Sequence, residues 1–155
     1  MTQIAIRVIV SFLLASTAIA SSKVALVGDA GASLPAQYAV RKLMTALEAR
    51  GVDVERPAGL SKAKAADIVL VAGPASQSLK TLGSALAGVP LPSAAESLLV
   101  KKLLWNAKRV LLIAGADDRG VVYAATGAAE QIRLSAGLSP LEAVAEASES
   151  PAVRE

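Results

Sequence analysis

Two residue types that often take part in catalysis are missing from this chain of 155 residues. It contains no cysteine and no histidine. The lack of cysteine excludes a disulfide scaffold and thiol chemistry. The lack of histidine removes the commonest general base and the commonest metal ligand in proteins. The sequence also lacks a phosphate-binding or cofactor-binding motif, so we expect no cofactor.

Aromatic residues are also scarce, and the charge is nearly balanced. Aromatics make up 3% of the chain, and Lys plus Arg outnumber Asp plus Glu by 16 to 13. Nucleic-acid binding would need a basic stripe with interleaved aromatics, whereas here the basic residues are scattered. The small pairs are Arg41-Lys42, Lys101-Lys102 and Lys108-Arg109, which are typical of solvated faces.

The N-terminus has the pattern of a secretory signal peptide. Arg7 precedes an apolar run from Val8 to Ile19, and Ala18-Ile19-Ala20 supplies a small-x-small site, so we expect residues 1–20 to be cleaved after Ala20. A membrane anchor is the alternative, but a span needs roughly 20 unbroken apolar residues. A second alternative is that this run forms a buried first strand or helix of the domain. The pattern predicts a secreted or periplasmic protein, with no stable membrane span after cleavage.

The remaining residues predict one α/β domain. Apolar runs predict strands at 23–27, 52–55, 67–72 and 109–114. Apolar spacing predicts helices from about 34 to 47 and from about 121 to 134, with a shorter helix at 76–86 weakened by Gly83. Residues 96–105 fit either a helix or a strand of a hairpin. The order indicates a mixed β-sheet with two main helices packed on it.

The first candidate site is the loop Gly28-Asp29-Ala30-Gly31, between a strand and a helix. Backbone N–H groups at such a helix start can bind phosphate. The loop, however, lacks the G-x-G-x-x-G pattern and the Lys-Ser/Thr pair of a P-loop. A simple strand-to-helix connection is the favoured interpretation, because glycine is routine there.

The second candidate is the segment AGADDRGVVY, residues 114–123. Asp117 or Asp118 is placed to cap the following helix, Arg119 to form a local ion pair, and Gly120 to allow a tight turn. An acid–base pair is the alternative interpretation. Glycosidic cleavage, however, needs two carboxylates that face each other across roughly 5 to 9.5 Å, and adjacent residues usually point apart.

On this segment the chain resembles a known family. The stretch RVLLIAGADDRGVVYAATGAAEQI is similar to the last strand and helix of the N-terminal domain of α-glucuronidases and β-hexosaminidase-like glycoside hydrolases. The family pattern is matched by Gly115, Asp117, Arg119, Gly120, Tyr123, Ala124 and Glu130, with Asp118 inside it. The resemblance covers about residues 22–135, assigns these residues a structural role, and favours a hairpin over residues 96–115.

The resemblance implies a non-catalytic accessory domain of an exported, polysaccharide-degrading glycoside hydrolase. In this family the domain packs beside a (β/α)8 barrel that carries the catalytic carboxylates, and a barrel needs roughly 250 residues. We therefore expect residues 136–155 to be a linker toward a barrel in the same protein, and the sequence to be a fragment. Sugar specificity would then lie in that barrel. The chain alone is expected not to be catalytic, and an apolar patch should mark where the barrel docks.

Two other functions stay open at this point. The first is a stand-alone periplasmic module that binds carbohydrate or another partner. The second is an enzyme in its own right, such as a flavodoxin-like protein, suggested by the loop at Gly28-Asp29.

Overall fold

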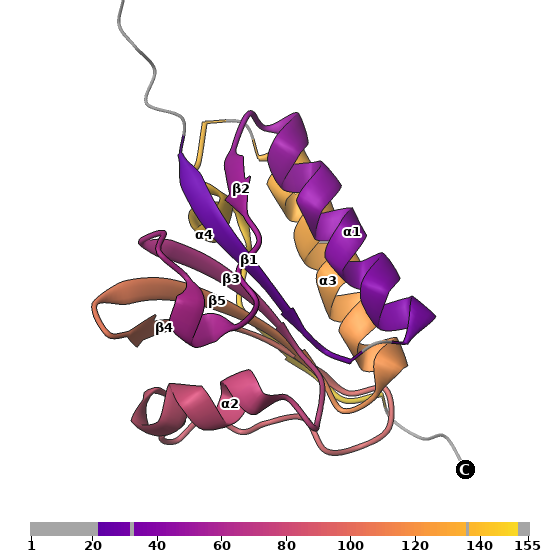
Figure 1. Ribbon diagram of the computed structural model, residues 1–155. Helices are drawn as coiled ribbons and strands as arrows, with labels where there is room; N and C mark the ends of the chain where they lie inside the picture. The colour runs from indigo at the N-terminus through magenta and orange to yellow at the C-terminus, as the bar shows by residue number, and fades with distance from the viewer. Residues whose placement is uncertain (1–21, 32, 136, 152–155) are drawn as a thin grey trace, which may run out of the picture.

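The computed structural model describes residues 22–31, 33–135 and 137–151 (Figure 1). The expected signal peptide, residues 1–20, lies outside the described residues. Within the described part of the chain, no helix combines the length and apolar content needed to cross a membrane.

The described residues form a six-stranded mixed sheet in the order β2-β1-β3-β5-β4-β6. Neighbouring strands pair in parallel from β2 to β5, whereas β4 is antiparallel to both β5 and β6. The strands are β1 (Lys23–Asp29), β2 (Asp53–Glu55), β3 (Asp67–Ala72), β4 (Leu98–Trp105), β5 (Lys108–Gly115) and β6 (Ala147–Glu149). The α/β class with a mixed sheet, predicted from the sequence, is confirmed.

Helices cover both faces of this sheet (Figure 1). The two long helices, α1 (Leu34–Ala49) and α3 (Asp118–Leu134), lie side by side on one face. The short helix α2 (Gln77–Leu82) and the turns η1 (Leu60–Lys62) and η2 (Gly83–Leu86) lie on the other. Alternate residues of β5 serve the two layers: Leu111 packs with the long helices, and Leu112 with the α2 side. Burial on both faces explains why β3 is apolar after its first residue.

The ambiguous segment is a strand. β4 and β5 form a hairpin whose turn residues, Asn106 and Ala107, have φ angles of 50° and 61°. Positive φ at both central positions is typical of a type I′ turn, which matches the twist of the flanking strands. The hairpin therefore forms despite helix-like leucine spacing, because the turn sets the register of β4 on β5.

The long helices are fastened at both ends. Ser33 caps α1 by accepting the backbone N–H of Ala36 at 3.2 Å. At the far end, the Arg50 guanidinium donates to the carbonyl oxygens of Ile132, Ser135 and Leu138 at 2.6, 2.5 and 2.9 Å. These carbonyls lie at and beyond the end of α3, where the helix leaves them without partners. Arg50 thus joins the end of α1 to the end of α3.

The chain after residue 135, expected to be a linker, folds onto the domain. Helix α4 (Pro140–Ala143) starts with a capping box between Ser139 and Glu142. It buries Leu141 in the core cluster beneath the long helices. β6 then pairs with β4, beside an ion pair of 2.8 Å between Lys101 and Glu146. The sheet therefore extends to Glu149.

Candidate functional site

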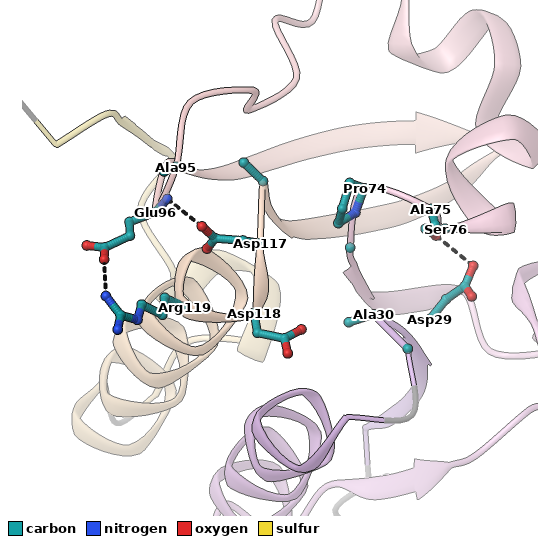
Figure 2. Close-up of a pocket in the computed structure, with 13 residues that line it drawn as sticks. Asp29, Ala30, Pro74, Ala75, Ser76, Ala95, Glu96, Asp117, Asp118 and Arg119 are labelled. Atoms are coloured by element: carbon teal, nitrogen blue, oxygen red, sulfur yellow. Dashed lines mark hydrogen bonds and ion pairs between the residues drawn. The ribbon is translucent and has the colours of Figure 1, made fainter.

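A cleft of about 730 Å³ lies at the carboxyl ends of β1, β3 and β5 (Figure 2). β1 leads through α1 to β2 on one side, and β3 leads through α2 to β4 and β5 on the other. The boundary between β1 and β3 is therefore a topological switch point, where open α/β sheets most often bind ligands. The cleft is lined by Asp29, Ala30, Gly31, Gly73, Pro74, Ala75, Ser76, Ala95, Glu96, Ala116, Asp117, Asp118 and Arg119.

Asp29, at the end of β1, is engaged by the start of α2. Its carboxylate accepts the Ser76 hydroxyl and the Ser78 backbone N–H, each at 2.6 Å. Burial acts to raise the pKa of Asp29, but these bonds act against it, and the net pKa lies below its ordinary value. The loop Gly28-Asp29-Ala30-Gly31 thus anchors the start of α2 through Asp29. Gly28 lies where β1 meets α1, and a Cβ at this position would be 2.9 Å from the Val40 side chain.

Asp117 is the N-cap of α3 and also holds the loop before β4. Its carboxylate accepts the backbone N–H of Gly120 at 2.9 Å and that of Glu96 at 2.8 Å. The Gly120 bond, then the Glu96 bond, hold the pKa of Asp117 below its usual value. The cap begins α3 at Asp118, earlier than the predicted Val121, because the polar turn itself joins the helix.

Gly115 and Gly120 are required by close backbone contacts beneath the cleft. A Cβ on Gly115 would lie 2.1 Å from the backbone nitrogen of Val121. A Cβ on Gly120 would lie 2.3 Å from the backbone oxygen of Ser97. A larger residue at Gly115 would force the end of β5 away from the start of α3, and one at Gly120 would force the start of α3 away from Ser97, next to β4.

Arg119 forms an ion pair with Glu96 at the rim of the cleft, at 2.5 Å. The hydrogen bond that the Arg119 guanidinium donates to Glu96, and then the negative charge of Glu96, raise the pKa of Arg119 above its ordinary value. Asp118 is exposed and points from the start of α3 toward the side of the cleft where Ala30 lies (Figure 2). Among the described residues, no hydrogen bond or ion pair engages the Asp118 side chain, which makes it the cleft carboxylate most accessible to a ligand.

The structure separates the motif residues into two groups. Asp117, Asp118 and Arg119 line the cleft, with Gly115 and Gly120 packed behind them. Tyr123 and Glu130 lie away from the cleft on the outer surface of α3. Tyr123 is exposed there, and Glu130 bonds Arg133 at 2.6 and 3.1 Å.

Sequence reasoning missed Glu96 as a member of this site. Glu96 contacts Asp117 and Arg119 across more than 20 residues of chain, and a single sequence carries no local signal for such a contact. A positive φ of 60° at Glu96 marks the turn that presents it.

Asp29 and Asp117 do not have the raised pKa that a general acid in glycosidic cleavage needs. A general acid needs a carboxyl whose pKa is raised, paired with a second carboxylate across the bond. Here the pKa values of Asp29 and Asp117 are both lowered, because both carboxylates accept several N–H or O–H groups. Within the described residues, no group of three or more carboxylates gathers to hold a metal ion. The arrangement serves to fasten two helix starts to the sheet.

Comparison with solved structures shows a likeness of fold. The domain is an α/β fold in which a six-stranded mixed sheet lies between two layers of helices. One solved structure with this fold is a GH138 enzyme targeting pectin rhamnogalacturonan II, at a TM-score of 0.54 and 14% sequence identity. The likeness covers 83% of this chain but only 15% of that enzyme's chain. No family model and no curated protein matches the sequence.

Proposed function

We propose that this chain is the non-catalytic N-terminal domain of an exported, α-glucuronidase-like glycoside hydrolase that degrades polysaccharides. The observation that carries the proposal is the fold likeness, in which most of this chain corresponds to a small part of a glycoside hydrolase. The segment from Gly115 to Tyr123 also supports it, since its residues resemble the strand-turn-helix pattern of such N-terminal domains.

The state of the cleft carboxylates supports a non-catalytic role. Asp29 and Asp117 act as acceptors for the starts of α2 and α3, and Glu96 is paired with Arg119. If one of these carboxylates took part in acid–base catalysis instead, it would lose the hydrogen bonds or the ion pair that hold the local fold together. In this proposal the catalytic carboxylates belong to a (β/α)8 barrel in the same protein, and this domain supports that barrel.

The direct test measures reducing-end release from uronic-acid-containing polysaccharides by the purified chain and by the full gene product. The chain alone should give no turnover, and the full gene product should be active. Turnover by the chain alone, abolished by Asp118→Asn, would overturn the non-catalytic role. A gene that encodes no hydrolase domain would overturn the proposal as a whole. Export predicts that the mature protein begins at Ser21, which N-terminal sequencing checks.

A second candidate function is carbohydrate binding by the domain itself. The cleft at the switch point and the accessible carboxylate of Asp118 favour it. Thermal-shift titration with uronic-acid oligosaccharides separates the two, because a ligand that binds the folded state raises the melting temperature. A saturable shift lost in Asp118→Ala would favour binding, and no shift would favour the supporting role.

A further inference from the structure

The outer edge of β4 is covered along only part of its length. β6 pairs with β4 from Leu98 to Val100, which is the end of β4 near the cleft. Beyond Val100, no strand within the described residues lies along this side of β4. We call residues 103–105, with the sequence Leu-Leu-Trp, the open edge of β4.

The pairing of β4 with β5 decides which backbone groups point out of the open edge. Trp105 and Lys108 flank the two-residue turn and form the hydrogen-bonded pair that closes the hairpin. Such pairs alternate along an antiparallel ladder, so Leu103 also bonds β5, whereas the N–H and C=O groups of Lys102 and Leu104 point away from it.

A contact of Lys102 agrees with this assignment. The Lys102 backbone N–H donates at 2.9 Å to the carboxylate of Glu146, which lies just before β6 on the outer side of β4. Within the described residues, no hydrogen bond engages the outward groups of Leu104. Leu104 therefore presents a backbone donor and a backbone acceptor to another strand.

The open edge also lacks the devices that usually prevent strand pairing. Natural proteins protect edge strands with charged side chains, lysine above all, or with proline. Lys101 and Lys102 occupy the positions next to β6, but residues 103–105 include neither a charge nor a proline. The Leu104 side chain is 72% exposed. The unprotected part of β4 is thus confined to the end near the hairpin turn.

A hollow of about 460 Å³ borders the open edge and is mainly apolar. Leu104, Val110 and Leu141 contribute to its lining. The charge of Arg109, which also lines it, is satisfied inside the domain by two hydrogen bonds to Asp67 at 2.7 and 2.6 Å. The hollow therefore favours an apolar side chain over a charged ligand.

The sequence of the open edge complements itself. If two copies pair in antiparallel register about Leu104, each Leu104 lies opposite the other and the two exchange a pair of backbone hydrogen bonds. Leu103 then lies opposite Trp105 of the second copy, and Lys102 lies opposite Asn106. Apolar residues meet apolar residues, and no like charges are directly opposite. A register centred on Lys102 would instead place two lysines opposite each other.

We propose that the open edge of β4 pairs with the open edge of a second copy of this chain and forms a dimer with two-fold symmetry. The same patch then serves both partners, as such symmetry requires. Figure 1 shows the turn between β4 and β5 at the margin of the domain, away from α1 and α3. The cleft lies at the opposite end of β5, so the dimer leaves it accessible. This proposal does not depend on the proposed function.

The first experiment measures the dimer dissociation constant of the purified chain by sedimentation equilibrium. Leu104→Lys places two lysines opposite each other, and Leu104→Pro removes the outward N–H while leaving the bonds to β5. Each variant should raise the dissociation constant roughly tenfold or more. Leu134→Lys is the matched control, since Leu134 is 64% exposed on α3, and it should leave the constant unchanged. Thermal unfolding of each variant verifies that it remains folded.

The second experiment tests the register and uses the absence of cysteine from the chain. Opposed Leu104 Cα atoms would lie roughly 5.5 Å apart, which a disulfide can span. Mild oxidation should therefore convert Leu104→Cys to a covalent dimer much faster than Leu134→Cys.

Three results would overturn the proposal. One is a parent chain that stays monomeric at every concentration. Another is a dimer that Leu104→Lys and Leu134→Lys weaken equally, or that forms disulfides at both cysteine positions at the same rate. The third is protection of Leu104→Cys from maleimide in the full gene product only, because another part of the polypeptide would then cover the edge. The proposed function would stand in each case, since its own test measures glycosidase activity.

Discussion

The backbone N–H of Glu96 donates to the carboxylate of Asp117 at 2.8 Å, although 21 residues separate them. The same carboxylate caps α3 through Gly120. The Asp117 side chain therefore holds the loop before β4 against the first turn of α3. The ion pair between Glu96 and Arg119 joins the same two segments. Residues 117–120 of the sequence motif therefore connect the loop before β4 to the start of α3.

Replacing Asp117 by Ala should destabilise the domain by about 1–2 kcal/mol, because the first turn of α3 loses its cap. The backbone N–H of Glu96 loses its acceptor in the same variant. The free energy of unfolding in urea measures this. Asp118→Ala is the control and should change it by no more than about 0.5 kcal/mol, since Asp118 is exposed. Equal effects from the two variants would show that Asp117 does not have this role.

The effect of replacing a glycine by alanine on stability should depend on the position of that glycine. Gly120→Ala should cost about 3 kcal/mol or prevent folding, because its Cβ would lie 2.3 Å from a backbone oxygen. Gly127→Ala should instead stabilise by about 0.5–1 kcal/mol, since the new methyl group meets nothing and alanine favours helix. Thermal unfolding of both variants measures the difference. A Gly120→Ala protein as stable as the parent would contradict the close packing of α3 on Ser97.

Stability should fall at acid pH. The folded-state pKa values of Asp29 and Asp117 lie below their ordinary values, so the unfolded chain binds protons first as pH falls. Their contribution is complete well above the ordinary carboxyl value of about 3.9, and is lost as pH falls through the lower folded-state values. Unfolding free energies measured from neutral pH to pH ~2 test this. Asp29→Asn should flatten the curve, and an unchanged slope would show that Asp29 gains nothing from Ser76 and Ser78.

Removing the guanidinium of Arg50 should loosen the end of α3. Arg50→Met should lower the free energy of unfolding by about 2 kcal/mol, because carbonyls of Ile132, Ser135 and Leu138 lose a charged donor. Hydrogen exchange should speed up at the end of α3 and in the turn that follows. Arg41→Met, an exposed change on α1, is the control. Equal exchange in both variants would contradict the link between the two helices.

The sequence predicts the strands and helices of this fold better than the long-range contacts that hold them together. The strand at 67–72 is apolar because both of its faces are covered, so its pattern alone places it inside the sheet. Ser33 and Asp117 carry local capping signals, and the structure places them at helix starts. In contrast, the Asp29–Ser76 bond and the Arg50 contacts join residues more than 40 positions apart, and only the folded chain brings them together. β6 escaped prediction because three residues carry too little pattern to mark a strand.

The most direct measurement of the central proposal compares the full gene product with a form that lacks residues 22–151. Glycosidase activity and melting temperature are recorded for both. If this domain supports a separate catalytic domain, the shortened protein should keep its kcat per folded molecule and melt at a lower temperature, because only supporting contacts are lost. Loss of kcat with an unchanged melting temperature would contradict the account, because it would place catalytic groups within this domain.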